Sequence, residues 1–539
     1  MKRPLILILL FVLLWAAGLS TRSITRPDEG RYAEIAREMA VSGDWVVPHL
    51  NGIPYFEKPP LQYWATATAI DVLGPTPLAA RLWTALLGLL GLAVVWRFGD
   101  RLFGHGAGVR AALVLAGSLY YAALGHVNSL DMGVSVWMTV AVCAFLAAQV
   151  GDRRWMWLAW AAAAAGFLSK GLMALALPGG TLVLYTLWTR DTSPWKRLEI
   201  LRGLPLFLLL SVPWFVLAAQ RHPEFLHFFF IHEHLERFTT TVHRRVEPAW
   251  YFLPILLAGL LPWTTLFPAS VLRPLRGFRS RAFSPQRFLA IYALFVVAFF
   301  SLSGSKLPSY ILPAFPAMAL LMGRQLMQRA TLPASLPWLS FGWAVALAGG
   351  AFLLAYPSHL GLSLGMDPDM VAPYQGFSTW ILAAASAMAT GAWLAARWRE
   401  RTLPALTALS LCSLLSVQCL MLGSDSLSPF TSSRQLARDH AAEFRDATHI
   451  YSIATYDQTL DYYMQRTVVL VAFEDELAFG LSLEPRHAIP TLDAFRPVWE
   501  NDRGALAFME PAMYDALVAR GWPMRLISRD SRRVIVARI

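Results

Sequence analysis

Residues 5–19 read LILILLFVLLWAAGL, an uninterrupted apolar run without a charged side chain. About 20 such residues cross a bilayer as a helix, which satisfies its own backbone hydrogen bonds in hydrocarbon. Comparable runs follow, among them AVALAGGAFLLAY at 344–356 and LPALTALSLCSLLSVQCLML at 403–422. Of the 539 residues, 56% are hydrophobic and 15% are charged, which is more apolar surface than a soluble protein can bury. The sequence therefore predicts a polytopic α-helical membrane protein.

About thirteen apolar runs are candidates for membrane-spanning helices. They begin near Leu5, Leu78, Val109, Met132, Trp155, Leu172, Leu204, Trp250, Phe288, Leu307, Leu336, Trp380 and Leu403. The first run follows a basic start and could be read as a secretory signal. No A-x-A cleavage site follows it and the rest of the chain is itself membrane-embedded, so an uncleaved first helix is the simpler interpretation.

The net charge of +11 is distributed over alternate loops. If Lys2 and Arg3 lie in the cytoplasm, the same side receives clusters of arginine and lysine, as the positive-inside rule expects. These clusters comprise Arg97, Arg101, Arg110, Arg153, Arg154, Arg190, Lys196, Arg197, Arg202, Arg273, Arg276, Arg279, Arg281, Arg287, Arg324, Arg329, Arg397, Arg399 and Arg401. The pattern argues against a nucleic-acid partner, and an odd number of spans places the C-terminal segment on the outer face.

The outward loops hold the unusual polar motifs. They are RPDEGRY (26–32), YFEKPP (55–60), HVNSLDM (126–132), LSKGL (168–172), IHEHLERF (231–238) and SGSKLPSY (303–310). Acidic, basic and imidazole groups from distant parts of the chain would therefore meet at one membrane surface. The sequence predicts an active site at that surface.

The first outward loop, residues 21–77, is too long to be a simple connector. Tyr32, Ile35 and Met39 recur at helical spacing opposite charged side chains, which predicts a helix lying in the membrane interface. Asp28 stands at the start of this helix. It could cap the helix N-terminus or act in catalysis, and the two roles are compatible because a cap fixes the orientation of the acid.

Glu57 and Lys58 precede Pro59 and Pro60, which fix the direction of the chain. The charged pair could form a surface salt-bridge turn. Alternatively, Lys58 suits a phosphate group and Glu57 is a hard oxygen ligand for a divalent ion.

Further charged residues stand at the outward ends of predicted spans. Asp131 should face the protein interior, either as a cap or ion-pair partner or in support of Asp28. Lys170 is either an interface anchor or a phosphate partner. Lys306 and Tyr310 either anchor their helix at the interface or contact a phosphorylated lipid head group.

The stretch FFFIHEHLERFTTTVHRR at 228–245 places His232, Glu233, His234 and Arg237 within two helical turns. A single histidine is usually structural. Metal ligation by one of the two histidines together with Glu57 is the functional alternative. The spacing H-E-x-x-H does not occur here, so a protease-type zinc site is not supported.

The hydropathy changes after about Ser424. The segment from Arg434 to Ile539 alternates short apolar runs such as TVVLVAF with amphipathic ones such as EPAMYDALVARG. We expect a transmembrane part over residues 1–425 and a small soluble α/β domain over residues 430–539. The second part carries no phosphate-binding glycine loop or nucleophile motif, so we expect it to cover or dock on the first.

The ordered motifs resemble those of a known family. D-E-x-R-Y-A-E-I-A-R-E-M, Y-F-E-K-P-P, an aspartate at the end of a later span, E-H-x-x-R-F and S-K-L-P-x-Y-I-L-P are similar to motifs of the lipid A aminoarabinose transferases. These enzymes belong, with the protein O-mannosyltransferases, to the GT-C class of membrane glycosyltransferases. The resemblance covers most of the membrane portion, and the ordered set is specific for the superfamily.

The resemblance implies an inverting enzyme on the outer face of the bacterial inner membrane. It would move 4-amino-4-deoxy-L-arabinose or a related aminosugar from a polyprenyl phosphate donor to lipid A, as a monomer among membrane lipids. Asp28 would be the principal catalytic carboxylate, supported by Asp131. The donor phosphate would meet Tyr32, Tyr55, Lys58, Arg237 and Tyr310, and Glu29, Lys170 and Lys306 complete the expected substrate-binding set. Glu57 with His232 or His234 would hold a divalent metal ion such as zinc.

Two alternatives remain open from the sequence. The acceptor could be a protein hydroxyl or another envelope glycan, in which case Asp28 would act as a general base. A lipid or solute transporter is the non-enzymatic alternative. It would show internal repeats and ionisable groups near the middle of the membrane, whereas the polar motifs here lie in loops at one surface.

Overall fold

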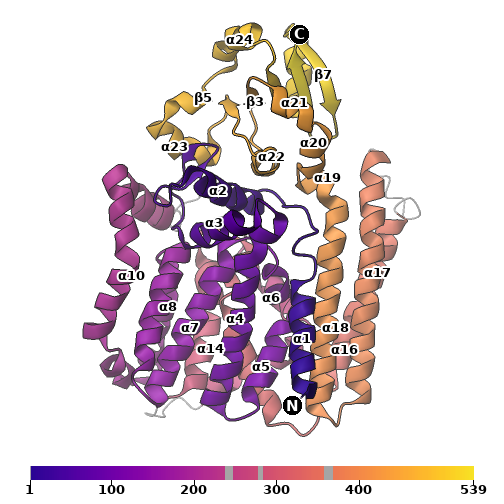
Figure 1. Ribbon diagram of the computed structural model, residues 1–539. Coiled ribbons are helices and arrows are strands. Elements are labelled where there is room, and N and C mark those ends of the chain that lie inside the picture. Colours follow the sequence, from indigo (N-terminus) through magenta and orange to yellow (C-terminus); the bar gives the residue numbers. More distant parts are fainter. Residues whose placement is uncertain (1, 237–246, 277–282, 357–367) are drawn as a thin grey trace.

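The computed structural model describes residues 2–236, 247–276, 283–356 and 368–539. Figure 1 shows three layers: a bundle of long helices, two helices lying across one end of the bundle, and a small domain beyond them. The N-terminus lies at the far end of the bundle and the C-terminus lies in the small domain. The predicted order of a membrane part followed by a small mixed domain is therefore the order that the structure has.

The apolar runs form the helices of the bundle. They are α1 (Lys2–Ala16), α4 (Pro77–Phe103), α5 (Ala107–Ala116), α6 (Leu119–Leu124), α7 (Leu130–Val150), α8 (Trp155–Lys170), α9 (Met173–Thr189), α10 (Ile200–Arg221), α13 (Phe252–Gly259), α14 (Pro285–Leu302), α15 (Ala314–Met327), α16 (Ser335–Ala355), α17 (Pro368–Arg397) and α18 (Thr402–Gly423). Within the described ranges, seven helices are long and apolar enough to cross a membrane, or eight if a bent pair counts as one span. The bent pair is Phe252–Gly259 with Thr264–Leu275. The multi-pass architecture is confirmed, and the number thirteen stays a prediction.

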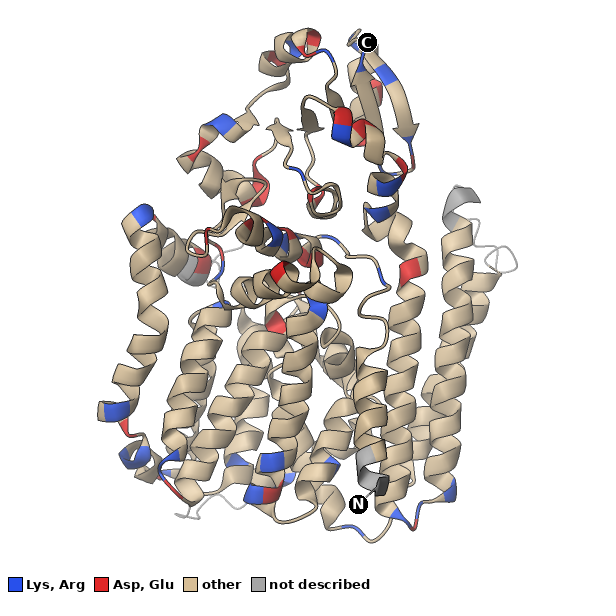
Figure 2. Cartoon of the chain, in the orientation of Figure 1, with Lys and Arg blue, Asp and Glu red and all other residues tan. Residues whose placement is uncertain are grey.

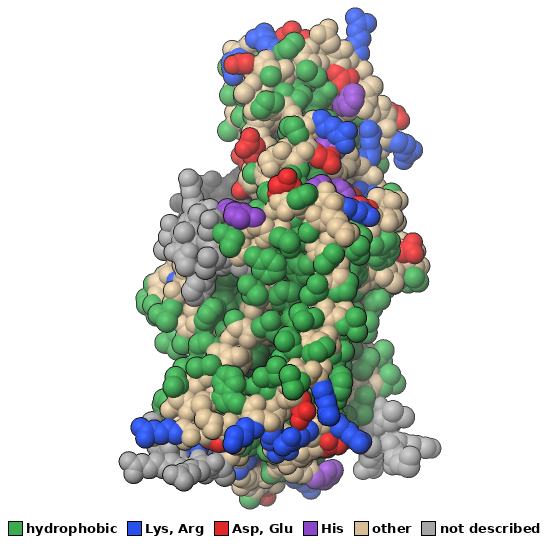
Figure 3. All heavy atoms as spheres, turned by 90° about the vertical axis from the view of Figure 1, so that its left-hand side faces the viewer, with side chains coloured by type: hydrophobic (Ala, Val, Ile, Leu, Met, Phe, Trp, Pro, Cys, Tyr) green, Lys and Arg blue, Asp and Glu red, His purple; other side chains and the backbone are tan. Residues whose placement is uncertain are grey.

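Helix burial explains how the bundle is arranged. In α7, 89% of the most apolar 18-residue stretch is buried inside the protein. The corresponding buried shares of α10 and α16 are 28% and 22%. Helix α7 is therefore central, and α10 and α16 lie at the edge, where their apolar side chains meet lipid. Figure 3 shows the resulting hydrophobic belt, bordered below by lysine and arginine side chains.

Charged residues are concentrated at the two ends of the bundle (Figure 2). Lysine and arginine gather at the end that holds the N-terminus, and acidic and basic residues mix at the opposite end, beneath the small domain. The basic residues that the sequence assigned to alternate loops therefore do lie together at one end of the bundle.

The C-terminal domain is a six-stranded sheet flanked by helices. The strands are β3 (Ile450–Ile453), β4 (Val469–Val471), β5 (Ala488–Ile489), β6 (Leu506–Met509), β7 (Met524–Arg529) and β8 (Val534–Arg538), in the order β5-β4-β3-β6-β8-β7. Strands β3 to β6 pair in parallel, and β8 joins β6 and β7 antiparallel. Strands β3 and β6 are buried at every position, as expected for parallel strands covered on both faces. The expected small α/β domain is confirmed.

The first outward loop shares a core with this domain. Its helices α2 (Asp28–Ser42) and α3 (Leu61–Leu73) lie across the end of the bundle (Figure 1). Tyr32, Ile35 and Met39 of α2 belong to the same apolar cluster as Leu460 and Phe508 of the C-terminal domain. Even the charged side of α2 is buried, because the C-terminal domain covers it. The pattern of α2 correctly indicated a helix but did not reveal this cover.

One buried ion pair fixes the start of α2 to the bundle. Arg81 of α4 is fully buried, and its guanidinium donates two hydrogen bonds of 2.8 Å to the carboxylate of Glu29. The same guanidinium donates to the carbonyl oxygens of Arg22 and Ser23, at 2.8 and 2.7 Å. Burial alone would raise the pKa of Glu29, but Arg81 lowers it to about 2. Removing one partner of such a pair typically costs about 3–5 kcal/mol of stability.

Gly30 permits the close approach of α2 to helix α22 (Gln458–Met464) of the C-terminal domain. A Cβ atom at residue 30 would lie 2.8 Å from the backbone carbonyl of Gln458 and 2.8 Å from the side chain of Thr459. Contacts of that length do not occur without displacement of the backbone. The glycine in the motif D-E-G-R-Y therefore has a packing role between the two parts of the chain.

A cluster of carboxylates lies buried where α2 meets α22. Glu34 forms a two-pronged pair with Arg37, at 2.6 and 2.7 Å, and Asp461 accepts a 2.8 Å hydrogen bond from the hydroxyl of Tyr456. Burial and the neighbouring Glu34 raise the pKa of Glu38 to about 8, and they also raise the pKa of Asp461. Arg37 carries one positive charge against the carboxyl groups of Glu34, Glu38 and Asp461. The cluster is therefore neutralised only if some of these carboxyl groups keep their protons.

This cluster predicts a loss of stability as the pH rises from about 4.5 to about 8. The folded protein holds the proton of Glu38 up to about pH 8, whereas an unfolded chain releases it near pH 4.5. The stabilisation is therefore complete below pH 4.5 and falls as the pH rises toward 8. Because glutamine cannot ionise, Glu38→Gln should lose less stability than the wild type between about pH 6 and pH 8, by on the order of 2 kcal/mol. Thermal unfolding of the purified protein at both pH values measures this difference.

Glu510, an exposed residue of the C-terminal domain, supplies a control. Glu510→Gln should follow the wild type at both pH values. Equal losses in Glu38→Gln and the wild type would contradict a bound proton at residue 38.

Candidate active site

A cavity of about 830 Å³ lies where α2, the ends of the bundle helices opposite the N-terminus and the C-terminal domain meet. Eight of the thirteen predicted site residues line it. They are Asp28, Tyr32, Glu57, Lys58, Asp131, Lys170, His232 and Tyr310. These side chains come from segments spread over about 280 positions of the sequence, and the fold brings them to one place.

Asp28 is the first residue of α2, but it does not cap the helix. Pro27 occupies the capping position without a side-chain bond. The carboxylate of Asp28 instead accepts a 3.0 Å hydrogen bond from Arg31, which also forms an ion pair with Glu476 of the C-terminal domain. The side chain of Asp28 is 45% exposed, whereas those of Arg31 and Glu476 are 10% and 13% exposed. Asp28 is therefore the member of this chain of charges that faces the open cavity.

Asp131 lies in the first turn of the central helix α7 and is buried. Its carboxylate forms an ion pair with Lys170, the last residue of α8. The amine of Lys170 also lies 4.9 Å from the centre of the Tyr310 ring, within the range of a cation–π contact. Asp131, Lys170 and Tyr310 thus form one connected group on the membrane side of the cavity.

Lys58 is held by acidic neighbours. Its amine donates hydrogen bonds of 2.7 Å to the carboxylate of Glu233 and 2.7 Å to the backbone carbonyl of Glu57. The carboxylate of Glu57 is 3.7 Å from the same amine. Glu57 and Lys58 therefore both face the cavity. The main partner of Lys58 is Glu233, so the pair is not a surface salt-bridge turn.

Tyr32 lines the cavity as a neutral phenol. Burial and the nearby carboxylate of Asp28 raise its pKa well above the ordinary value. A phenol that keeps its proton can donate a hydrogen bond to a phosphate or sugar oxygen.

Three predicted substrate-binding residues do not line the cavity. The carboxylate of Glu29 is occupied by Arg81, as described above, so its prediction as a substrate ligand is wrong. Tyr55 is 2% exposed and lies behind the cavity wall. Lys306 is buried, and its amine donates a 2.7 Å hydrogen bond to the backbone carbonyl of Ser303. The sequence correctly placed these three residues at the end of the bundle that holds the cavity, but it did not show which way each side chain points.

The expected metal site is only partly within the described residues. His232 lines the cavity, and its ring stacks on that of Phe228 at 5.3 Å. The residues that the structure describes contain no group of three histidine, cysteine or carboxylate side chains placed to hold a metal ion. Arg237 and the side chain of His234 lie outside the described part of the chain.

Several residues of the cavity wall could not be predicted from the sequence. Arg31 belongs to the charged side of the predicted interfacial helix, and the sequence predicted no role for Glu233. The C-terminal domain contributes Gln458, Glu476 and Phe479, which lie in segments without any recognisable motif. Only the docking of that domain on α2 brings them to the site.

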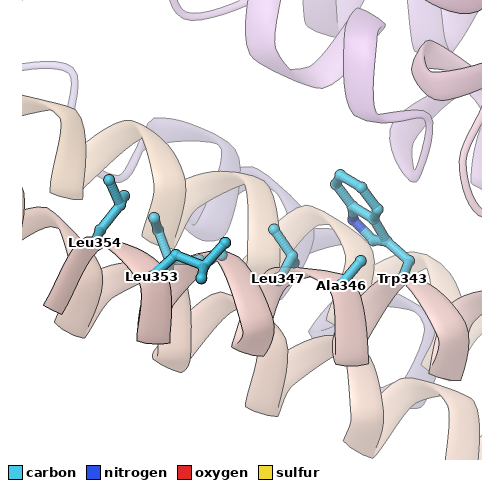
Figure 4. A pocket seen from close by; sticks show the side chains of 7 residues that line it. Trp343, Ala346, Leu347, Leu353 and Leu354 are labelled. Atoms are coloured by element: carbon cyan, nitrogen blue, oxygen red, sulfur yellow. The ribbon is translucent and has the colours of Figure 1, made fainter. Parts of the chain in front are cut away.

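Two apolar grooves accompany the cavity. One of about 540 Å³ runs between α8 and α10, and Phe230 lines both this groove and the cavity. The other, of about 340 Å³, lies on α16 and α17, where Trp343, Leu347 and Leu354 line it (Figure 4). The second groove offers no charged group, so it is not a candidate for catalysis.

Two family models match the chain. Residues 436–538 match the aminoarabinose transferase C-terminal domain, and residues 57–216 match the dolichyl-phosphate-mannose-protein mannosyltransferase family. The archaeal oligosaccharyltransferase AglB from Archaeoglobus fulgidus shares the fold at a TM-score of 0.50 with 12% identity. The membrane part therefore has the GT-C architecture.

Curated relatives carry one common description. The chain is 37% identical over 324 residues to an undecaprenyl phosphate-alpha-4-amino-4-deoxy-L-arabinose arabinosyl transferase of Edwardsiella ictaluri. It is 35% identical over 372 residues to the protein of the same description from Pseudomonas aeruginosa strain UCBPP-PA14. These alignments cover 59% and 67% of this chain, and 58% and 63% of the two relatives.

A solved structure matches over nearly the whole length. ArnT from Cupriavidus metallidurans, bound to undecaprenyl phosphate, is 34% identical, has a TM-score of 0.90, and is matched over 98% of its chain and 99% of this one. An apo structure of the same protein gives a TM-score of 0.89. Both the membrane bundle and the C-terminal domain are included in this match, and the chain therefore belongs to the aminoarabinose transferase family.

Proposed function

We propose that this protein transfers 4-amino-4-deoxy-L-arabinose from undecaprenyl phosphate to lipid A in the bacterial inner membrane. The observation that carries the proposal is the convergence of Asp28, Lys58 and Asp131, from three separate segments, on one cavity at the end of a membrane bundle. The descriptions of the curated relatives and the undecaprenyl phosphate in the related structure support the choice of donor.

The cavity faces the periplasm in this proposal. Lysine and arginine gather at the opposite end of the bundle, which the positive-inside rule assigns to the cytoplasm. The C-terminal domain, which covers the cavity, then lies in the periplasm as well.

The shape and polarity of the site suit a lipid phosphate. A polyprenyl chain is apolar and fits the groove between α8 and α10, which shares Phe230 with the cavity. Its phosphate would then enter a space lined by Lys58, Tyr32 and Arg31. An apolar groove that leads to cations is the arrangement expected for a ligand with a long tail and an anionic head.

Charge development explains why these cations promote transfer. Breaking the bond between the sugar and the phosphate leaves negative charge on the departing undecaprenyl phosphate. A preplaced ammonium such as Lys58 stabilises that charge more strongly in the transition state than in the bound donor. Glu233 holds the amine of Lys58 at 2.7 Å, which fixes its position before the phosphate arrives.

The two aspartates have different tasks. Asp28 is the more exposed, at 45% against 11% for Asp131, and so is the carboxylate that substrates can reach. A lipid phosphate acceptor is already anionic, so Asp28 need not remove a proton from it. It would orient the acceptor or stabilise positive charge on the sugar carbon during inversion. Asp131 positions Lys170, which in turn contacts the ring of Tyr310.

The divalent metal remains part of the proposal, with no catalytic step assigned to it. Glu57 and His232 both line the cavity and are of the residue types that bind zinc. Oxygens of the donor phosphate would complete the coordination. Because the described residues provide fewer than three candidate ligands in one group, the metal would be held mainly when donor is bound.

Replacing Asp28 tests the catalytic assignment. Asp28→Asn keeps the size of the side chain and removes its charge, so transfer should fall by at least about 100-fold while folding is retained. The assay follows release of undecaprenyl phosphate from labelled donor in the presence of lipid A. Asp493→Asn, at an 89% exposed position of the C-terminal domain, is the matched control. Unchanged turnover of Asp28→Asn would remove this residue from the mechanism.

Replacing Lys58 tests the phosphate contact. Lys58→Ala should reduce the rate by about 100-fold, since loss of one such contact typically raises the barrier by about 3 kcal/mol. Lys58→Arg keeps a cation at this position and should restore part of the activity. If Lys58→Ala uses the donor with normal affinity and rate, the phosphate lies elsewhere.

Metal content tests the ion directly. Elemental analysis of the purified protein with undecaprenyl phosphate should find about one divalent ion per chain. Glu57→Gln should lose it, while Glu484→Gln, in the C-terminal domain, should retain it. Equal metal content in the two variants would exclude Glu57 as a ligand, whatever their activity.

A further inference from the structure

A second polar hollow lies at the opposite end of the bundle from the cavity. It measures about 660 Å³ and is formed by the start of α8, the start of α10 and the 3₁₀ helix η1 (Ser193–Arg197) between α9 and α10. Four cations, Arg153, Arg154, Lys196 and Arg202, line it together with the carboxylates of Asp152 and Glu199. The hollow therefore carries two more cations than carboxylates, and the transfer reaction uses none of them.

Apolar side chains border this hollow. Trp157, Trp195 and Ile200 are 48%, 40% and 47% exposed, and Leu201 is 93% exposed. Tryptophan is enriched where the hydrocarbon of a bilayer meets its head groups. Figure 3 shows lysine and arginine side chains directly beneath the hydrophobic belt on the side of the molecule that carries α8 and α10. The hollow thus lies at the depth of lipid head groups.

The cations in the hollow are available to a ligand. The carboxylate of Glu199 lies 3.3 Å from the guanidinium of Arg153 and 3.8 Å from that of Arg202, yet the side chains of these two arginines are still 58% and 73% exposed. Arg154 and Lys196 are exposed and form no ion pair with any residue that the structure describes. Glu199 therefore orients two of the cations without neutralising the set.

We propose that this hollow binds the phosphate group of an anionic glycerophospholipid from the cytoplasmic leaflet. The guanidinium groups would donate hydrogen bonds to the phosphate oxygens, as arginine does in other phosphate sites. The acyl chains would follow the lipid-facing side of the first turns of α10, where Leu201 and Leu204 are 93% and 41% exposed. This lipid is neither donor nor acceptor, and its site lies at the other end of the bundle from the reaction.

The apolar rim favours a lipid over a free phosphate ion. A soluble phosphate would use the cations but would leave Trp157, Ile200 and Leu201 without a contact. A phospholipid covers both kinds of surface at once, and each basic side chain near an anionic lipid contributes about a five-fold gain in binding.

Native mass spectrometry of the full-length protein in detergent can test this site. Phosphatidylglycerol and phosphatidylcholine are titrated separately into the wild type, Arg154→Gln/Lys196→Gln and Arg397→Gln/Arg401→Gln. The last variant removes the same charge from two exposed residues, the last residue of α17 and the residue before α18, at the same end of the bundle. Binding at other places, the cavity included, is common to all three proteins. Thermal unfolding verifies that both variants are folded.

We expect Arg154→Gln/Lys196→Gln to bind phosphatidylglycerol about 25-fold more weakly at one site, about five-fold for each charge removed. Arg397→Gln/Arg401→Gln should bind it as the wild type does, and phosphatidylcholine should occupy the site in none of them. Equal weakening in the two variants would overturn the proposal in favour of a general charge effect. Displacement of the lipid by inorganic phosphate at millimolar concentration would overturn it in favour of a soluble ion. Because sugar transfer is not measured, the result is independent of the proposed function.

Discussion

The buried pair of Arg81 and Glu29 is the interaction on which the geometry of the site depends. Arg81 stands near the start of a membrane helix, and its guanidinium gathers Glu29 and the backbone of the chain that leaves α1. Asp28 is the neighbour of Glu29 and points to the cavity. The position of the exposed acid is therefore set by a residue that does not line the cavity, and a buried charge stabilises the fold one residue away from the proposed catalytic carboxylate.

Arg31, Lys58 and Lys170, which line the cavity, are each paired with a carboxylate, and this pairing makes a polar site compatible with its apolar surroundings. Asp28 meets Arg31, Asp131 meets Lys170, and Lys58 meets Glu233. Each group would be costly to bury alone at the edge of a membrane. Paired, the groups hold fixed orientations at little electrostatic cost, so a substrate phosphate meets positive charge that is already in place.

Hydropathy and motif order were sufficient for the membrane architecture, the mixed C-terminal domain and eight of the residues that line the cavity, because apolar periodicity and short motifs are local properties. Glu29 and Asp28 are adjacent and chemically alike, and only the position of Arg81 in space distinguishes their roles. Glu476 could not be identified, since its partner Arg31 lies about 445 positions away in the sequence. Such pairings depend on how two layers dock, and no local pattern encodes that.

The contact at Gly30 has a consequence for how these proteins can be recombined. Residue 30 fits against the backbone of Gln458, while Arg31 beside it reaches Glu476, so the first outward loop and the C-terminal domain form one complementary surface. A chimera that takes its C-terminal domain from one relative and its membrane bundle from another would join two surfaces whose side chains do not fit each other. When segments are exchanged between relatives, α2 and the C-terminal domain should therefore be taken from the same protein.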